Sequence, residues 1–343
     1  MNNKRPKILI IYTGGTIGMY KDYQTNALKP FNFSKLEKYI PELKQINCCI
    51  SNWSFQTPID SSNITPTDWV LLLESIERNY SEYDGFVVLH GTDTMSYSAS
   101  ALSFMIENLK KPIIFTGSQL PIGDLRTDAK ENLITAIEIA SLQENGQPVV
   151  QEVGLYFEYK LFRANRTTKI SASHFNAFSS PNFPCLIESG VTLEINRPYL
   201  KYGEPTFPTT FNKKVIDSIL LIKLFPGIRK EVLISQLKTE GIEAVLFESF
   251  GAGNAPMFDW FKRIILELIE SRIHIVNITQ CFGGGVMPAH YETSLSRIHP
   301  NIINGKDLTT ESALTKLMYL LGQDLDVSRF KEIYEREIRG EMS

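Results

Sequence analysis

The chain alternates short runs of apolar residues with longer stretches in which apolar residues recur at helical spacing. The runs are rich in β-branched and aromatic side chains and are bounded by Gly, His or Thr. Continuous apolar runs of this length are typical of parallel strands that are covered on both faces. The predicted strands are 7–12, 85–89, 112–116, 154–157, 218–224, 244–247 and 273–278.

The intervening stretches have the spacing of amphipathic helices. One of them has a clear start signal, because Thr65 can cap a helix, Pro66 suits the first turn and Asp68 favours the positive N-terminal end. The predicted helices are 67–80, 96–108, 130–141, 229–237, 257–270 and 310–321.

Strands and helices that alternate in this order predict an α/β fold with a doubly wound, mostly parallel sheet. The segment 196–214 interrupts the order, since it is rich in Pro, Thr and aromatic residues and has no helical period. We therefore expect a larger N-terminal catalytic α/β domain (1–195), a linker (196–214) and a smaller C-terminal α/β domain (215–343).

Composition excludes several classes of protein. The 343 residues are 43% hydrophobic and 21% charged, with a net charge of −3, so the basic footprint of a nucleic-acid-binding protein is missing. No apolar run approaches the ~18 residues of a membrane span, and the run at 8–12 is too short for a signal peptide. We expect a cytoplasmic protein that binds neither nucleic acid nor membrane.

Cysteine and histidine spacing indicates no metal and no cofactor. The four cysteines, Cys48, Cys49, Cys185 and Cys281, form no C-x-x-C pair, and the five histidines are scattered. Adjacent Cys48 and Cys49 have poor geometry for a disulfide or a metal. We expect free thiols in a reducing compartment.

Hydroxyl-bearing loops follow several of the predicted strands, at the edge where ligands bind in open α/β sheets. The loops are TGGTIG (13–18), DSSN (60–63), HGTDT (90–94), GSQ (117–119) and RANRTTK (163–169). The first fits neither the dinucleotide-binding nor the phosphate-binding glycine motif. By itself it is equally compatible with a plain connection between a strand and the next element.

A hydroxyl nucleophile needs a neighbouring base. No G-x-S-x-G elbow is present, and His90 at a strand end is more typical of a packed histidine than of a base. Lys169 is the remaining candidate, which Asp93 and Thr92 could hold in place. Spacing alone favours the plainer alternative that Lys169 is an exposed lysine in a basic stretch.

Taken together, these motifs resemble the bacterial L-asparaginase family, most closely its cytoplasmic (type I) branch. The stretches that carry the resemblance are YTGGTIGM (12–19), DSSNITPTDW (60–69), DGFVVLHGTDTMSYSASALSFMIENL (84–109), KPIIFTGSQLP (111–121), NRTTK (165–169) and GNAP (253–256). They extend over nearly the whole chain.

The resemblance implies hydrolysis of L-asparagine to L-aspartate and ammonia. It makes Thr16 the nucleophile that forms an acyl-enzyme, and it places Thr92, Asp93 and Lys169 in a second cluster that moves protons and orients water. It assigns Asp60, Ser61 and Ser62 to the substrate α-carboxylate, with Asp93 at the α-ammonium and Thr92 beside it. It also implies a homodimer or a tetramer of two dimers, with Asn254 reaching a neighbouring subunit's substrate.

Two positions depart from the family pattern. A loop tyrosine that helps to activate the nucleophile aligns with Ala27, and Tyr23 is the nearest replacement. Some cytoplasmic members bind asparagine at an effector site through an arginine, whose position holds Glu248. We expect allostery by asparagine to be weak or absent.

Other functions remain open at this stage. The alternatives are a glutaminase-asparaginase, an amidase that supplies ammonia, and a catalytically silent amino-acid sensor. The first two differ from an asparaginase in substrate, and the third in lacking turnover.

Overall fold

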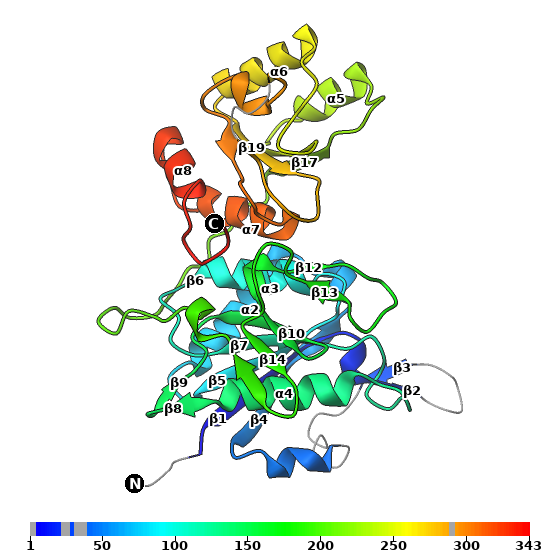
Figure 1. Cartoon of the computed structure of the whole chain (residues 1–343), viewed down its shortest axis with the longest axis vertical. Helices are drawn as coiled ribbons and strands as arrows, with labels where there is room; N and C mark the ends of the chain where they lie inside the picture. Colours follow the sequence, from blue (N-terminus) through cyan, green and yellow to red (C-terminus); the bar gives the residue numbers. More distant parts are fainter. Residues whose placement is uncertain (1–4, 22–27, 31–39, 288–291) are drawn as a thin grey trace. The chain divides into compact units, whose positions relative to one another are not determined.

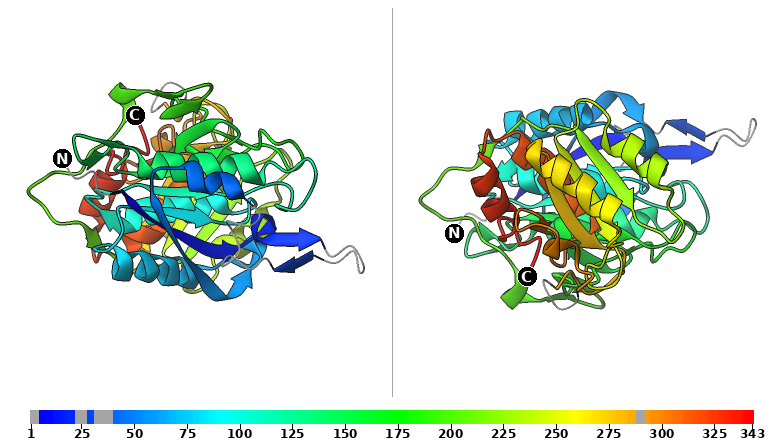
Figure 2. Two further views of the ribbon diagram at one scale, coloured as in Figure 1. Left: turned by 90° about the horizontal axis from the view of Figure 1, so that it is seen from below. Right: turned by 90° about the horizontal axis from the view of Figure 1, so that it is seen from above.

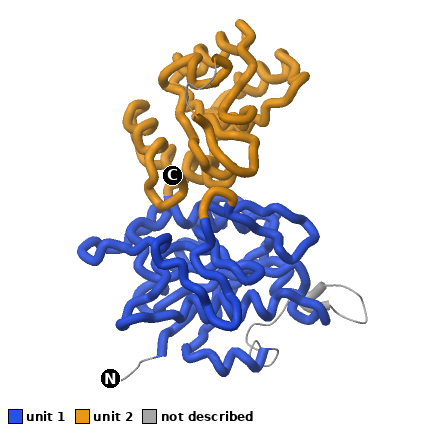
Figure 3. Tube along the Cα trace, viewed as in Figure 1, with its two compact units in different colours: residues 1–180, 184–213 blue, residues 181–183, 214–343 orange. Residues whose placement is uncertain are grey.

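The computed structural model describes residues 5–21, 28–30, 40–287 and 292–343. The chain divides into two compact units, 1–180 with 184–213 and 181–183 with 214–343 (Figure 3). Most of the segment 196–214, where we expected a linker, thus lies within the first unit.

The first unit is built on an eight-stranded sheet (Figure 1). Five neighbouring strands are parallel, and three antiparallel strands extend one edge. The order is β15 (Leu193–Ile195), β14 (Ile187–Ser189), β11 (Lys160–Arg163), β10 (Val153–Phe157), β7 (Ile113–Thr116), β5 (Gly85–Leu89), β1 (Lys7–Gly14) and β4 (Cys49–Ile59). The predicted fold class is confirmed.

Helices cover both faces of this sheet. Helix α4 (Ala129–Ser141) packs on β1, β5, β7 and β10, whereas α3 (Met95–Met105) packs on β7 and β10 and against α2 (Pro66–Asn79) (Figure 2). As predicted, α2 begins after Thr65, whose N–H and hydroxyl both donate to the Asp68 carboxylate at 2.8 and 2.7 Å. Helix α3 is buried on nearly all sides.

Short strand pairs complete the first unit. They are β2 (Met19–Lys21) with β3 (Leu28–Pro30), β6 (Ile106–Glu107) with β16 (Thr210–Phe211), β8 (Gln143–Glu144) with β9 (Gln147–Pro148), and β12 (Thr168–Lys169) with β13 (Phe178–Ser179). Helix α3 ends at Met105, three residues before the predicted boundary at 108, because the chain continues there as β6. The pairing of β6 with β16 joins the segment around residue 210 to this unit.

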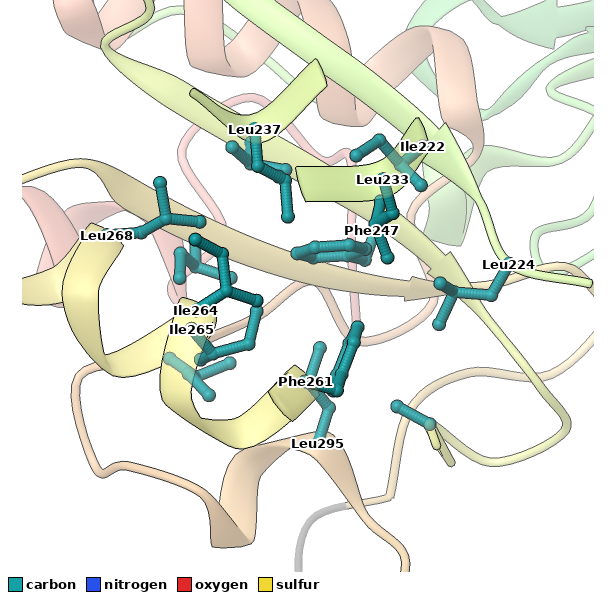
Figure 4. Packing of buried hydrophobic residues seen from close by; sticks show 14 residues of the cluster. Ile222, Leu224, Leu233, Leu237, Phe247, Phe261, Ile264, Ile265, Leu268 and Leu295 are labelled. Carbon is teal, nitrogen blue, oxygen red and sulfur yellow. The ribbon is translucent and has the colours of Figure 1, made fainter. Parts of the chain in front are cut away.

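The second unit contains a four-stranded parallel sheet, in the order β17 (Ile219–Lys223), β18 (Ala244–Ser249), β19 (His274–Thr279) and β20 (Ile303–Asn304). Side chains from α5 (Lys230–Leu237) and α6 (Asp259–Glu270) pack on this sheet around Phe247 and Phe261 (Figure 4). Helix α7 (Thr310–Leu321) contacts β17 and β18, and α8 (Val327–Tyr334) contacts α7. No helix of the described segments has the length and apolarity needed to cross a lipid bilayer.

Candidate active site

The TGGT sequence forms a tight turn at the carboxyl end of β1. Gly14 and Gly15 both have positive φ, +143° and +87°, a conformation that disfavours side chains. A Cβ on Gly14 would overlap the Ile59 carbonyl, and one on Gly15 would overlap the Gly91 backbone. Both positions therefore require glycine, because the end of β4 lies against Gly14 and the loop after β5 lies against Gly15.

The candidate nucleophile Thr16 opens a 3₁₀ turn, η1 (Thr16–Gly18), directly after these glycines. Thr16 is half-buried between buried Gly15 and Ile17. The Tyr12 hydroxyl donates to the carbonyls of Gly15 and Gly18 at 3.4 and 3.3 Å. Burial raises the pKa of Tyr12 to about 12, so it remains a donor at neutral pH and holds the turn that carries Thr16.

The loop that follows β4 lies against Gly91, which also contacts Gly15. A Cβ on Gly91 would overlap the Ser61 hydroxyl, and the Thr94 hydroxyl donates to the Ser61 carbonyl at 2.7 Å. The carboxyl ends of parallel strands share one edge of the sheet. The turns after β1, β4 and β5 therefore meet through Gly15, Gly91 and Ser61.

Asp60 holds the shape of the loop after β4. Its carboxylate accepts hydrogen bonds from the Ser62 N–H and hydroxyl at 3.0 and 2.9 Å. These bonds, the backbone one first, lower the pKa of Asp60, and its exposure to solvent also favours the ionised carboxylate. The Ser61 hydroxyl makes no hydrogen bond with any residue that the structure describes, which leaves it available to a ligand.

Lys169 joins the predicted cluster. Its Nζ lies 2.9 Å from Thr92 Oγ1 and 2.6 Å from Asp93 Oδ1. The lysine side chain is only 16% exposed, whereas that of Asp93 is 64% exposed. The pairing of β12 with β13 fixes the backbone of Lys169. The surface-lysine alternative is therefore wrong, and Lys169 points into the loop that follows β5.

Sequence reasoning missed Gln119, although it lies in one of the loops that follow a strand. Its Nε2 donates to the His174 carbonyl at 3.0 Å, and its Oε1 accepts from Thr92 Oγ1 at 3.2 Å. Because a carbonyl can only accept, this orientation of the amide is fixed. The Thr92 hydroxyl thus donates to Gln119 and accepts from Lys169.

The remaining predicted residues are Tyr23 and Asn254. Tyr23 lies outside the described residues, as does Ala27. Asn254 belongs to the second unit, where its Oδ1 accepts a hydrogen bond from Thr293 Oγ1 at 3.1 Å. Its expected contact with a neighbouring subunit's substrate stays a proposal.

The groups that the structure brings together here are polar and charged. Within the described segments, no three His, Cys, Asp or Glu residues are arranged to hold a metal ion. The site brings together hydroxyls, an ammonium, carboxylates and backbone N–H groups. Such groups suit a small polar zwitterion and nucleophilic attack by a hydroxyl.

Known family models match most of the chain. Residues 7–201 match the family model "Asparaginase, N-terminal", and residues 218–334 match "Glutaminase/Asparaginase C-terminal domain". The chain is 39% identical over 342 residues to L-asparaginase 1 of Escherichia coli, which covers 99% of each protein.

Two solved structures are similar along the whole chain. L-asparaginase I of Vibrio cholerae has a TM-score of 0.87 and 39% identity, covering 99% of this chain and 100% of that one. The thermostable L-asparaginase of Thermococcus kodakarensis has a TM-score of 0.87 and 30% identity, covering 98% and 99%.

Proposed function

Since this chain belongs to the asparaginase family, we propose that it hydrolyses L-asparagine to L-aspartate and ammonia through an acyl-enzyme on Thr16. The observation that carries the proposal is the pairing of Lys169 with Thr92 and Asp93 in the loop that abuts the Thr16 turn. An ester intermediate splits one difficult amide hydrolysis into two easier steps.

In the first step, Thr16 Oγ attacks the side-chain carboxamide carbon and a C–O bond forms. The hydroxyl proton passes to the amide nitrogen, the C–N bond breaks and ammonia leaves. Backbone N–H groups of the Gly15 turn and of Thr92 stabilise the oxyanion, an effect worth ~2.7–4 kcal/mol per donor in known enzymes.

In the second step, water attacks the ester carbon and a new C–O bond forms. The ester bond to Thr16 Oγ1 breaks, the proton lost by the water is delivered to that oxygen, and L-aspartate leaves. Thr92 and Lys169 are suited to orient this water and move its proton, because the Thr92 hydroxyl is already held between Lys169 and Gln119. Proton transfer assisted by positioned side chains contributes ~10²–10⁴-fold in rate.

The rest of the site recognises the two charges of an amino acid. We propose that the Ser61 hydroxyl binds the α-carboxylate, and that Asp60 acts by holding the Ser61–Ser62 turn, because its own carboxylate is already bonded to Ser62. The exposed Asp93 carboxylate suits the α-ammonium.

The proposed setting is the cytoplasm, where the four cysteines, all free in the structure, remain reduced. We propose a homodimer or a tetramer of two dimers, in which Asn254 completes the site of a neighbouring subunit. No metal or cofactor takes part in the proposed steps.

Ammonia release from L-asparagine and L-glutamine, measured in parallel, tests the proposal. The wild type should release ammonia from asparagine. Thr16→Ala should lower this rate by up to ~10⁶-fold, and Thr16→Ser should keep part of the wild-type rate. Preferential release from glutamine would favour a glutaminase-asparaginase. Tight asparagine binding with no turnover would favour a sensor.

A further inference from the structure

His90 is a buried group that the proposed mechanism does not use. It directly follows β5, is 1% exposed and packs near Phe115. Its Nδ1 lies 2.7 Å from the Gly91 carbonyl, and its Nε2 lies 2.9 Å from Ser98 Oγ. Both ring nitrogens therefore have partners, one of them in the backbone next to Thr92.

The direction of every hydrogen bond in this chain of residues can be deduced. Trp69 Nε1 can only donate, and it does so to Ser98 Oγ at 2.9 Å. The Ser98 proton is then free to go to His90 Nε2, so the ring hydrogen is on Nδ1 and is donated to the Gly91 carbonyl. Burial lowers the pKa of His90 to about 4, which leaves a single proton on the ring at neutral pH.

This arrangement fixes one peptide plane at the site. In a planar trans peptide the N–H points opposite to the C=O. The Gly91 carbonyl is directed at His90, so the Thr92 N–H is directed away from that ring. No atom of the described residues accepts a hydrogen bond from this N–H. The Gly91 Cα, from which this peptide starts, and the preceding His90–Gly91 peptide lie against Gly15, next to Thr16.

We propose that Trp69, Ser98 and His90 are positioning residues that hold the Gly91–Thr92 peptide with its N–H aimed at the oxyanion of the tetrahedral intermediate. The inference rests on the proposed function. It assigns catalytic importance to residues from α2, α3 and the end of β5 that need not touch the substrate. An oxyanion donor works only when it is fixed before charge develops.

A purely structural role is the competing explanation, because buried polar groups need partners in any core. The two roles differ in what they affect. Loss of a core hydrogen bond lowers stability, whereas misalignment of the Thr92 N–H lowers kcat with little effect on KM.

Ser98→Ala tests this distinction, with Ser103→Ala as its matched control. Ser103 is a buried serine of the same helix whose hydroxyl donates to the Ser100 carbonyl at 2.6 Å. We expect Ser98→Ala to lower kcat by about tenfold or more with KM unchanged, part of the ~10²–10³-fold effect of losing such a donor. Ser98→Thr should restore the rate, and Trp69→Phe should lower kcat less. Equal kcat values for Ser98→Ala and Ser103→Ala at the same folded fraction would overturn the proposal.

A ¹⁵N NMR spectrum of the histidine rings supplies a readout that needs no activity, with a His90→Phe variant to identify the signals. The proposal predicts a neutral ring protonated on Nδ1 in the wild type at neutral pH, and a ring protonated on Nε2 would overturn it. If the wild type releases no ammonia, the proposed function fails and takes the catalytic role with it. The spectrum then shows separately whether the hydrogen-bond chain exists.

Discussion

Gly15 lies against the backbone of Gly91 with no room for a side chain between them. One glycine precedes the candidate nucleophile Thr16, and the other precedes Thr92. The contact therefore fixes the position of the Thr16 turn relative to the loop that carries Thr92. Small displacements are costly in such sites, because a 1 Å error in the position of a catalytic group reduces rates by up to ~10²-fold.

Gly15→Ala should accordingly reduce both stability and activity. Gly15 has φ +87° and ψ 172°, a backbone region essentially confined to glycine that costs a side chain ~1–3 kcal/mol, and displacement of Gly91 adds to this. Gly146→Ala is the matched control, because Gly146 has a similar φ of +77° and open space around it. Urea unfolding and ammonia release should show a stability loss in both variants and a loss of kcat, tenfold or more, only in Gly15→Ala. Equal kcat values for the two variants would contradict the role of this contact.

Lys169→Met should abolish turnover and leave the fold intact. The methionine keeps most of the side-chain length but removes the charge and the bonds to Thr92 and Asp93. Lys160→Met is a suitable control, because the one ion pair of the Lys160 side chain with a residue that the structure describes is an exposed pair with Glu188 at 3.7 Å. A variant that kept more than about a tenth of the wild-type rate would remove Lys169 from the mechanism, given the ~10²–10⁴-fold share of a general base.

Gln119→Leu should lower kcat by roughly three- to tenfold, the value of one hydrogen bond. The substitution frees the Thr92 hydroxyl to rotate away from its present orientation. Gln151→Leu is the control, because among the described residues the Gln151 side chain bonds only to the Pro148 carbonyl and the Gly203 N–H, at 3.3 and 3.1 Å. Steady-state kinetics should separate the two variants, and an unchanged kcat in Gln119→Leu would show that Thr92 needs no such partner.

Saturation with L-asparagine should be hyperbolic. Glu248, at the position of the family's effector arginine, accepts a hydrogen bond from Thr310 at 2.5 Å and lies 3.5 Å from Lys223 Nζ. Its carboxylate would repel the α-carboxylate of an amino-acid effector. Initial rates over a wide range of asparagine concentrations test this, and a sigmoidal curve would show that an effector site survives.

The central strands of both sheets were predictable because they are buried on both faces, so that their hydrophobic pattern is continuous. Strand β4 was not, since none of its residues is buried and polar residues are mixed with apolar ones along it. The short antiparallel strands β11, β14 and β15 were missed because runs of three or four residues carry little pattern. Helix α8 was also missed, as a short, largely polar segment.

The site was only partly predictable from its residues. The hydroxyl-rich loops followed from the strand ends, but Lys169 by itself read as a surface lysine, and only the family resemblance singled it out. Gln119 and Ser98 were not chosen because their partners come from distant loops and helices. Their roles depend on which atom donates each hydrogen bond, and no sequence pattern predicts this.

Intact-mass measurement after a rapid acid quench tests the central claim most directly. Wild-type protein mixed with L-asparagine and quenched within one turnover should gain the mass of one aspartyl group, and peptide mapping should locate it on Thr16. Thr16→Ala, treated in the same way, should gain nothing. Asparagine turnover with the aspartyl group on another residue, or with an unchanged Thr16→Ala rate, would contradict the account.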